Sequence, residues 1–136
     1  MKFEIIEHTA DVGICGYGNT PEEIFAAIST GMFSLIVDLK TVKEEIIEEF
    51  EVRAETLEDL AVLYLSELLF RHDTYRMLFA RFQLAIENRN GSWILRAKAF
   101  GEKIHGHELN LLIKGVTYHM LEINLEKGYG TVIFDV

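Results

Sequence analysis

The second half of the chain most constrains the fold, because after residue 72 apolar and polar residues alternate and the helical period disappears. Residues 82–86 alternate, Asn90-Gly91 turns the chain, and residues 93–99 alternate back, which is typical of a β-hairpin. Strand therefore follows strand without an intervening helix, and this order argues against a doubly wound sheet.

Further strands follow a loop at residues 101–110, which contains two histidines and two glycines. We expect a strand at residues 111–114. We also expect a final hairpin in which residues 112–125 pair with residues 129–136 through a turn that contains Gly128.

Two amphipathic helices are predicted in the first half of the chain. Thr20 is the N-cap of the first helix, Glu23 completes a capping box, and the apolar face ends near Ile36. Thr56 caps the second helix, at residues 54–72. The buried stripe expected on this second helix consists of Leu57, Leu60, Ala61, Tyr64, Leu65 and Leu68.

Short strands at residues 2–6, 13–17 and 45–54 complete the first half. A chain of 136 residues with 49% hydrophobic residues can form one core but not two comfortable ones. Two helices and about seven strands that do not alternate predict a single α+β domain over residues 1–136. Its sheets should be mixed but largely antiparallel and packed against the two helices.

The net charge of −9 disfavours direct binding to nucleic acid, because phosphates would repel the protein. No stretch approaches the ~20 consecutive apolar residues of a membrane span, and the N-terminal sequence does not resemble a signal peptide. We therefore expect a cytoplasmic protein with no membrane association.

An acidic block spans residues 44–59, where eight carboxylates accompany one basic residue, Arg53. We expect a solvated strand face that leads into a helix N-terminus, where carboxylates favour the helix dipole. The alternative is a docking surface for a basic partner.

The sequence contains no P-loop, dinucleotide-binding, nucleophile-elbow or HExxH motif. His105 and His107 flank Gly106, and for this pair we expect an exposed loop rather than a metal site. His72 closes the second predicted helix, where a cation favours the C-terminal dipole, so we expect it to be structural.

Asp11 poses a different problem, because aspartate is disfavoured in an apolar strand unless the fold uses it. The chain ends with Asp135 and Val136 after another apolar strand. If that strand is held in place, its two carboxylates tolerate each other only beside a cation, and oxygen ligands suit Ca²⁺ or Mg²⁺ better than Zn²⁺. A cap or a surface ion pair is the alternative role. Other carboxylates that would serve in a different strand register are Glu4, Glu7 and Asp38.

Four segments together resemble the archease family and occur in the family's order, and the resemblance covers essentially the whole chain. The segments are HTADVGI at 8–14, LSELLF at 65–70, KGVTYHMLEI at 114–123 and VIFDV at 132–136. Archeases are small, acidic α+β proteins that assist RtcB-type RNA ligases in tRNA splicing and RNA repair. The resemblance implies a protein that is not itself an enzyme. It would promote transfer of GMP to the ligase's active-site histidine, so that the ligase turns over repeatedly.

By position in these motifs, the resemblance implies a divalent cation held by Asp11, Asp135 and Val136, with Ca²⁺ expected and Mg²⁺ or Mn²⁺ as alternatives. The other motif residues, expected to orient the ligands or to contact the partner, are His8, Lys114 and His119.

Small residues follow Asp11 in the same strand. Gly13 and Gly16 should let neighbouring backbone approach where a side chain would obstruct it. Cys15, the one cysteine, should be a small buried residue rather than a nucleophile.

The sequence departs from the family pattern on both sides of Lys114. Residues 111–113 are apolar where archeases often carry a Thr-Glu pair, Gly115 replaces alanine, and Met120-Leu121 replaces Glu-Met. Fewer carboxylates beside Lys114 make this segment more apolar, which favours a modified docking surface.

Two other functions stay open at this point. A binding module or chaperone for another RNA-processing enzyme, such as a tRNA methyltransferase, would need the acidic surface but not the cation. An independent hydrolase using His8 or His119 with Asp11 would need a nucleophile or phosphate-binding motif, and the sequence offers neither.

Overall fold

The computed structural model describes residues 2–7 and 11–136, and the chain there forms two α-helices and eight strands. In chain order the elements are β1 (Lys2–Glu7), β2 (Asp11–Tyr17), α1 (Pro21–Ile36), a short 3₁₀ helix (Leu39–Thr41), β3 (Ile46–Ala54), α2 (Leu57–Tyr75), β4 (Met77–Arg89), β5 (Ser92–Lys103), β6 (Gly115–Val116), β7 (Glu122–Asn124) and β8 (Tyr129–Asp135).

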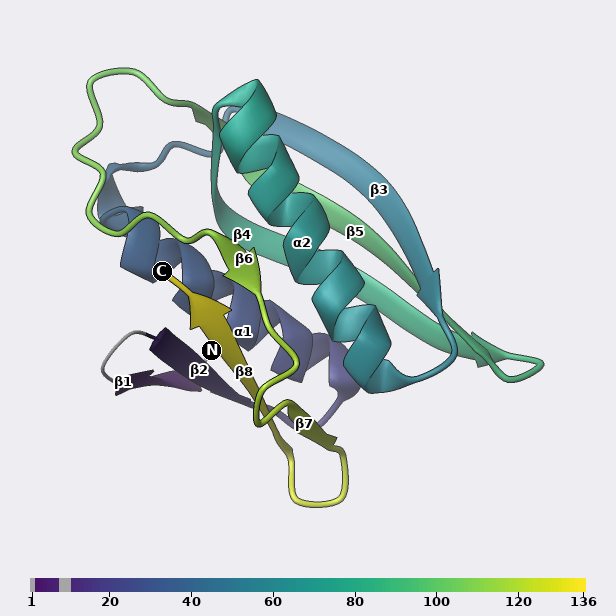
Figure 1. The fold of residues 1–136 in the computed structure, drawn as a ribbon. Coiled ribbons are helices and arrows are strands. Elements are labelled where there is room, and N and C mark those ends of the chain that lie inside the picture. Colours follow the sequence, from purple (N-terminus) through teal and green to yellow (C-terminus); the bar gives the residue numbers. More distant parts are fainter. Residues whose placement is uncertain (1, 8–10) are drawn as a thin grey trace.

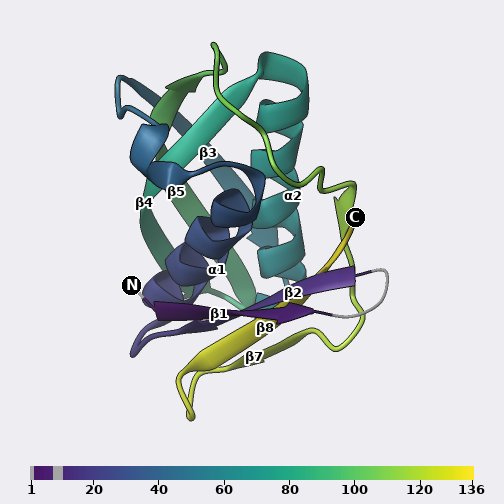
Figure 2. The same ribbon diagram turned by 90° about the vertical axis from the view of Figure 1, so that its left-hand side faces the viewer.

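The strands form two antiparallel sheets. A five-stranded sheet has the order β1-β2-β8-β6, with β7 also pairing with β8, and a three-stranded sheet has the order β3-β5-β4. The helices lie between the sheets: α1 contacts β4 on one side and β2 on the other, while α2 packs against the three-stranded sheet (Figures 1 and 2). The predicted α+β class is confirmed.

Both helices begin at the predicted caps. The Thr20 hydroxyl accepts the N–H of Glu23 at 3.1 Å, and the Thr56 hydroxyl accepts the N–H of Asp59 at 3.0 Å. The Glu23 carboxylate reaches back one residue further than a standard capping box, to the N–H of Asn19 at 2.7 Å. These bonds satisfy N–H groups that an α-helix leaves without internal partners.

The core lies between the two sheets and around both helices. Its largest fully buried side chains include Phe25, Phe33, Tyr64, Phe79 and Phe134. The Tyr64 hydroxyl donates to the Ser29 hydroxyl at 2.8 Å, so the buried polar groups of α1 and α2 satisfy each other. Burial raises the pKa of Tyr64, which keeps this phenol a donor.

Helix α2 is longer than predicted and β4 begins earlier. The helix runs past His72 to Tyr75 and ends where Arg76 adopts a left-handed conformation with φ of 60°. His72 is buried rather than placed at an exposed helix end, and its Nδ1 lies 2.8 Å from the Met77 carbonyl oxygen. The start of β4 was missed because residues 77–79 are all buried and show no alternation.

The predicted strand at residues 111–114 is wrong. The N–H groups of Asn110 and Leu111 donate to the carbonyls of Ile36 and Leu35 at 2.8 and 3.2 Å. These carbonyls belong to the last turn of α1, which has no internal partners for them, so the segment caps the helix instead of joining a sheet. Conversely, residues 101–103 of the predicted loop are the end of β5.

None of the helices in the described part of the chain is long and apolar enough to cross a membrane.

Candidate metal centre

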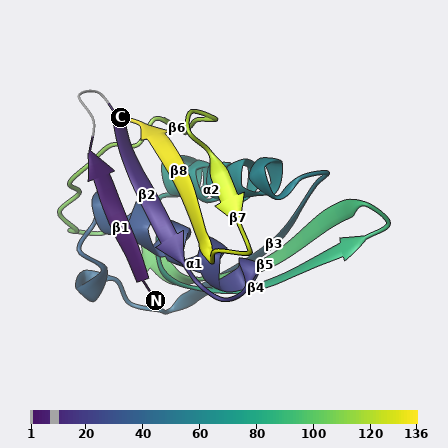
Figure 3. The same ribbon diagram turned by 90° about the horizontal axis from the view of Figure 1, so that it is seen from below.

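Asp11 and Asp135 lie directly opposite each other on the neighbouring strands β2 and β8. Asp11 is the first residue of β2 and Asp135 the last of β8, so both stand at the same end of the five-stranded sheet (Figure 3). Directly opposed residues of an antiparallel pair point to the same face, with Cβ atoms about 4.5–5.5 Å apart. The register therefore brings together two carboxylates from opposite ends of the sequence.

The end of β8 is held from both sides. Asp135 is paired with Asp11 on one edge and with Gly115 of β6 on the other. The main-chain N–H of Lys114 also donates to the Asp135 carbonyl oxygen at 2.7 Å. Val136 is half-buried and packs against the core. The condition set by the sequence, a terminal strand that is held in place, is met.

The opposed carboxylates lack a basic partner within the described residues. No ion pair found in residues 2–7 and 11–136 involves Asp11 or Asp135. Like charges directly opposite each other in a sheet are destabilising by about 0.2–1 kcal/mol. Asp11 is half-buried and Asp135 exposed, so the pair opens to solvent, where water can complete a coordination shell. With an oxygen of Val136, this donor set fits a hard cation such as Ca²⁺.

Lys114 and Gly115 border the pair. Lys114 reaches Asp135 through its main chain and leaves its side chain exposed. A Cβ at Gly115 would meet nothing within 4 Å, so the space beside the Asp135 carboxylate is open.

His119 is not brought to the pair. Because β6 is antiparallel to β8, the chain beyond Gly115 runs away from Asp135, and Thr117 donates through its N–H and its hydroxyl to the Ile133 carbonyl at 3.0 and 2.9 Å. His119 is exposed beyond this point, so its proposed pairing with Asp11 in a hydrolase gains no support. His8 lies outside the described residues.

The alternative carboxylates occupy other places. Glu4 and Glu7 of β1 pair with Cys15 and Val12 and do not face Asp11. Asp38 caps the 3₁₀ helix by accepting the N–H of Lys40 at 3.1 Å. The observed register therefore favours Asp11 with Asp135.

The small residues of β2 are explained by their neighbours. A Cβ at Gly16 would lie 2.9 Å from the Ile24 carbonyl oxygen, so helix backbone does approach this glycine as predicted. At Gly13 the backbone also approaches, because a Cβ would lie 3.3 Å from the Val132 carbonyl oxygen, but the tightest neighbour is the Ile133 side chain, whose Cδ1 would be 2.6 Å away. Cys15 is buried, as predicted, and free.

A second cluster of ligand atoms forms where an exposed loop was expected. His105 is exposed over 69% of its side chain, but His107 is exposed over only 4%, and both rings contact the buried Glu102. The carboxylate oxygens of Glu102 lie 2.8 Å from Nε2 of His105 and 3.0 Å from Nε2 of His107. The spacing Glu-x-x-His-x-His was the available signal, and it was missed because Glu102 was assigned to a loop rather than to β5.

The electrostatics of Glu102 are set by its donors. The N–H of Lys43 donates to Oε2 at 2.8 Å, and this bond, together with those from the histidines, lowers the pKa of Glu102 to about 2. Glu102 is therefore ionised at all ordinary pH values.

Four of the eight carboxylates of the acidic block are ion-paired within the chain. Its ion pairs join Glu44 to Arg81 (2.7 Å), Glu48 to Arg71 (2.8 Å), Glu49 to Lys98 (4.0 Å), and Glu51 to Arg53 and Arg96 (3.0 Å each). This arrangement agrees with the predicted solvated strand face, whereas no ion pair found among residues 2–7 and 11–136 involves the remaining four carboxylates, Glu45, Glu55, Glu58 and Asp59.

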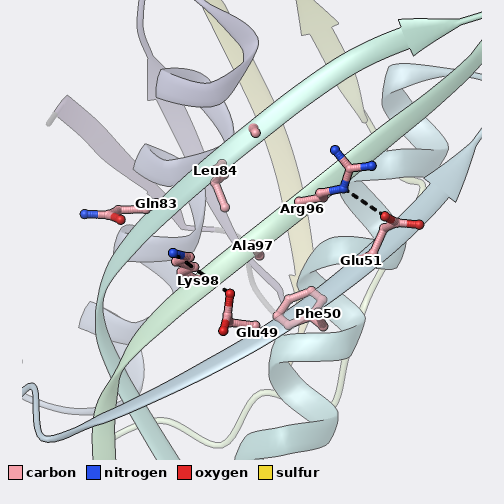
Figure 4. Close-up of a pocket in the computed structure, with 9 residues that line it drawn as sticks. Glu49, Phe50, Glu51, Gln83, Leu84, Arg96, Ala97 and Lys98 are labelled. Atoms are coloured by element: carbon pink, nitrogen blue, oxygen red, sulfur yellow. Dashed lines mark hydrogen bonds and ion pairs between the residues drawn. The ribbon is translucent and has the colours of Figure 1, made fainter.

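A groove of about 560 Å³ lies on the face of the three-stranded sheet that is turned away from the helices (Figure 4). Its charged lining consists of Glu49 paired with Lys98 and Glu51 paired with Arg96. The charges balance, and the one amine in the lining, that of Lys98, is ion-paired with Glu49, so we assign no chemistry to this groove.

Comparison with known proteins agrees with the motifs. Residues 3–136 match the model of the Archease protein family (MTH1598/TM1083). Protein archease of Pyrococcus furiosus is 41% identical over 124 residues, covering 90% of this chain and 87% of that protein. Protein archease of Sulfurisphaera tokodaii is 34% identical over 138 residues, covering 100% and 98%.

The fold is also similar to that of a protein of known structure. The solution structure of Methanobacterium thermoautotrophicum protein 1598 superposes with a TM-score of 0.87 at 34% identity, and the match covers 98% of each chain.

Proposed function

The chain belongs to the archease family, and from this premise we propose that it is a protein cofactor of an RtcB-type RNA ligase in tRNA splicing and RNA repair, without catalytic activity of its own. In this role it promotes guanylylation of the ligase. The bond between the α-phosphorus of GTP and the pyrophosphate oxygen breaks, and a phosphorus–nitrogen bond to the ligase histidine forms. The ligase then turns over repeatedly.

The opposed carboxylates of Asp11 and Asp135 carry this proposal. With an oxygen of Val136 they would hold a divalent cation, expected to be Ca²⁺, with Mg²⁺ or Mn²⁺ as alternatives. The bound cation would supply positive charge to a phosphate or carboxylate of the partner complex. Lys114 immediately precedes β6, and its N–H donates to the Asp135 carbonyl oxygen. Its exposed side chain would contribute a second positive charge beside the cation.

Exposed apolar side chains near Lys114 support a protein partner. Leu109, Leu112, Tyr118 and Met120 are each exposed over more than 40% of their surface, and Leu112 is exposed over 66%. Large apolar side chains gathered along one exposed segment are typical of a contact surface. The net charge of −9 favours docking to a basic protein over direct contact with RNA.

The test is transfer of radiolabelled GMP to a purified ligase from the same organism, with GTP and Mn²⁺, and with this protein at a substoichiometric concentration. We expect wild type to accelerate guanylylation catalytically and Asp135→Asn to lose most of the acceleration. Glu126→Gln, which removes a carboxylate from the β7–β8 turn, is the matched control and should behave as wild type.

Two results would count against the proposal in different ways. No acceleration by wild type contradicts the cofactor role. Full acceleration of guanylylation by Asp135→Asn and by Asp11→Asn would support the cofactor role but would show that the cation is not needed for it.

A binding module for another RNA-processing enzyme, such as a tRNA methyltransferase, is the second candidate. It depends on the acidic block as a docking surface, and the carboxylates of Glu44, Glu48 and Glu51 are ion-paired with arginines of this chain. We therefore place the ligase first.

A further inference from the structure

We propose that Glu102, His105 and His107 form a second metal site, one that binds Zn²⁺. It is built from the end of β5 and the following loop, which lies at the end of the molecule opposite the β7–β8 turn (Figures 1 and 2). This site shares no residue with the Asp11–Asp135 pair and is independent of the proposed function.

The ligand atoms already converge. One imidazole nitrogen from each histidine and one carboxylate oxygen of Glu102 all lie within 4.8 Å of one another. The two rings are 4.7 Å apart between centroids and inclined at 72°, so they approach the carboxylate from different directions. Gly106 between them has φ of +67°, a conformation that favours glycine and lets adjacent side chains turn towards one carboxylate.

The donor set determines which metal fits. Two imidazoles and one carboxylate suit Zn²⁺, whereas Ca²⁺ prefers oxygen alone. Bonds of about 2.0–2.1 Å at tetrahedral angles place ligand atoms about 3.3 Å apart. Nε2 of His105 and Nε2 of His107 lie 2.8 and 3.0 Å from different oxygens of Glu102. One oxygen and the two nitrogens lie within 4.8 Å of one another, so small side-chain movements that open the short contacts and close the longer one give tetrahedral spacing. Three protein ligands leave a fourth position for water on the exposed side of His105.

Binding requires one proton to move on each ring. The N–H of His105 donates to Nδ1 of His107 at 3.1 Å, so the neutral His107 ring carries its proton on Nε2 and donates it to Glu102. To bind zinc through Nε2, His107 takes up the tautomer protonated at Nδ1, and the His105 N–H turns to water instead. His105 makes the same change of tautomer, so two neutral rings bind the metal without net release of protons.

The surrounding structure supports a metal ligand at Glu102. The carboxylate is buried to 3% exposure, and it keeps the hydrogen bond from the Lys43 N–H, which orients it. The N–H of Ile104, next to the site, donates to the Arg76 carbonyl at 2.8 Å. Zinc would therefore bind the loop after β5 to the end of β5, at a point where main-chain hydrogen bonds already connect this region to Arg76, after α2, and to Lys43, before β3.

The test is titration of the chelator-treated full-length protein with Co²⁺, followed by its displacement with Zn²⁺. We expect one Co²⁺ per chain with the intense visible absorption of tetrahedral coordination, and displacement by Zn²⁺. His105→Ala and His107→Gln should each weaken binding by more than about tenfold. His119→Ala is the matched control and should bind as wild type, because that exposed histidine lies on another loop.

A second measurement reports which nitrogen of each imidazole ring carries the proton. Nitrogen-15 spectra of the imidazoles should show His107 protonated at Nε2 before zinc is added and at Nδ1 afterwards. Since His105 is exposed, His105→Ala will fold, so unaltered Co²⁺ binding by this variant would overturn the proposal. Absence of Co²⁺ binding by wild type, or an unchanged His107 tautomer with zinc, would overturn it as well.

Discussion

The two sheets use the same antiparallel geometry with opposite charge patterns. Between β3 and β5, Glu49 is opposite Lys98 and Glu51 is opposite Arg96. Between β2 and β8, Asp11 is opposite Asp135. Opposed residues of an antiparallel pair are close neighbours on one face of the sheet, so the first arrangement stabilises the fold and the second opposes it unless a cation is present.

The same contrast extends over all the strands. The strands of the three-stranded sheet carry five carboxylates (Glu48, Glu49, Glu51, Glu87, Glu102) and six basic residues (Arg53, Arg81, Arg89, Arg96, Lys98, Lys103). The strands of the five-stranded sheet carry five carboxylates (Glu4, Glu7, Asp11, Glu122, Asp135) and one basic residue (Lys2). Among the strands, uncompensated charge is thus concentrated in the sheet that ends at the candidate metal centre.

The largest expected effect concerns Ca²⁺ at the opposed aspartates. At a free Ca²⁺ concentration of 100 times Kd, binding should raise the free energy of unfolding by about 2.7 kcal/mol. Asp135→Asn should abolish this increase, while Glu49→Gln on the other sheet should leave it unchanged. Urea unfolding with and without Ca²⁺ measures both. An equal Ca²⁺ effect in Asp135→Asn would mean that the cation binds elsewhere.

Arg71→Met should have the next largest effect, because it breaks the best-buried ion pairs of the three-stranded side. Arg71 is bonded to Glu48 and Glu67 at 2.8 Å, with less than a third of each side chain exposed, and its guanidinium lies 4.8 Å from the Phe50 ring centroid. Leaving two partly buried carboxylates unpaired should cost about 1–2 kcal/mol of unfolding free energy.

The control for this variant is Arg89→Met, which breaks the more exposed pair with Glu87 on the same sheet and should be near neutral. If both variants lose the same stability, burial does not determine the strength of the pairs, and the contrast between the sheets rests on charge number alone.

Much of this arrangement could be predicted from the sequence, and the failures have physical causes. Caps at Thr20 and Thr56 were predicted because their side chains act on residues three positions away. The pairing of Asp11 with Asp135 depends on a long-range register that no local pattern encodes, and only the family resemblance suggested it.

Local sequence patterns gave wrong predictions where tertiary contacts determine the structure. The strand expected at residues 111–114 instead satisfies the carbonyls at the end of α1. The Glu102 cluster was missed because a buried carboxylate at the end of a long strand has the same sequence appearance as one in an exposed loop.

Without Ca²⁺, the effect of Asp135→Asn on the free energy of unfolding should have the opposite sign. Asp135→Asn removes one of two like charges and should stabilise the metal-free protein by about 0.2–1 kcal/mol, although the same change removes stabilisation by Ca²⁺. Thermal unfolding in a Ca²⁺ chelator is the measurement, and Glu126→Gln, in the exposed turn before β8, controls for the change in net charge. Metal-free Asp135→Asn that is less stable than wild type would show that the carboxylate has a structural partner within the chain.

The smallest effect on the free energy of unfolding is expected for Arg96→Gln, and this effect should depend on pH. Hydrogen bonds from Arg53 and Arg96 lower the pKa of Glu51, so this carboxylate contributes stability above its unfolded pKa of about 4.5 and loses that contribution as pH falls through its folded value. Removing Arg96 should therefore reduce stability slightly at pH 7, and the difference from wild type should vanish in strong acid, where Glu51 is protonated in both proteins. In 1 M salt the Arg96→Gln variant should be as stable as wild type, because exposed charges are screened there.

Urea unfolding of both proteins at pH 7 and at pH 2.5 measures the difference in the free energy of unfolding. A deficit that persists at low pH and high salt would assign the role of Arg96 to packing of its side chain, and the opposed pairs of β3 and β5 would then not be the electrostatic counterpart of Asp11 and Asp135.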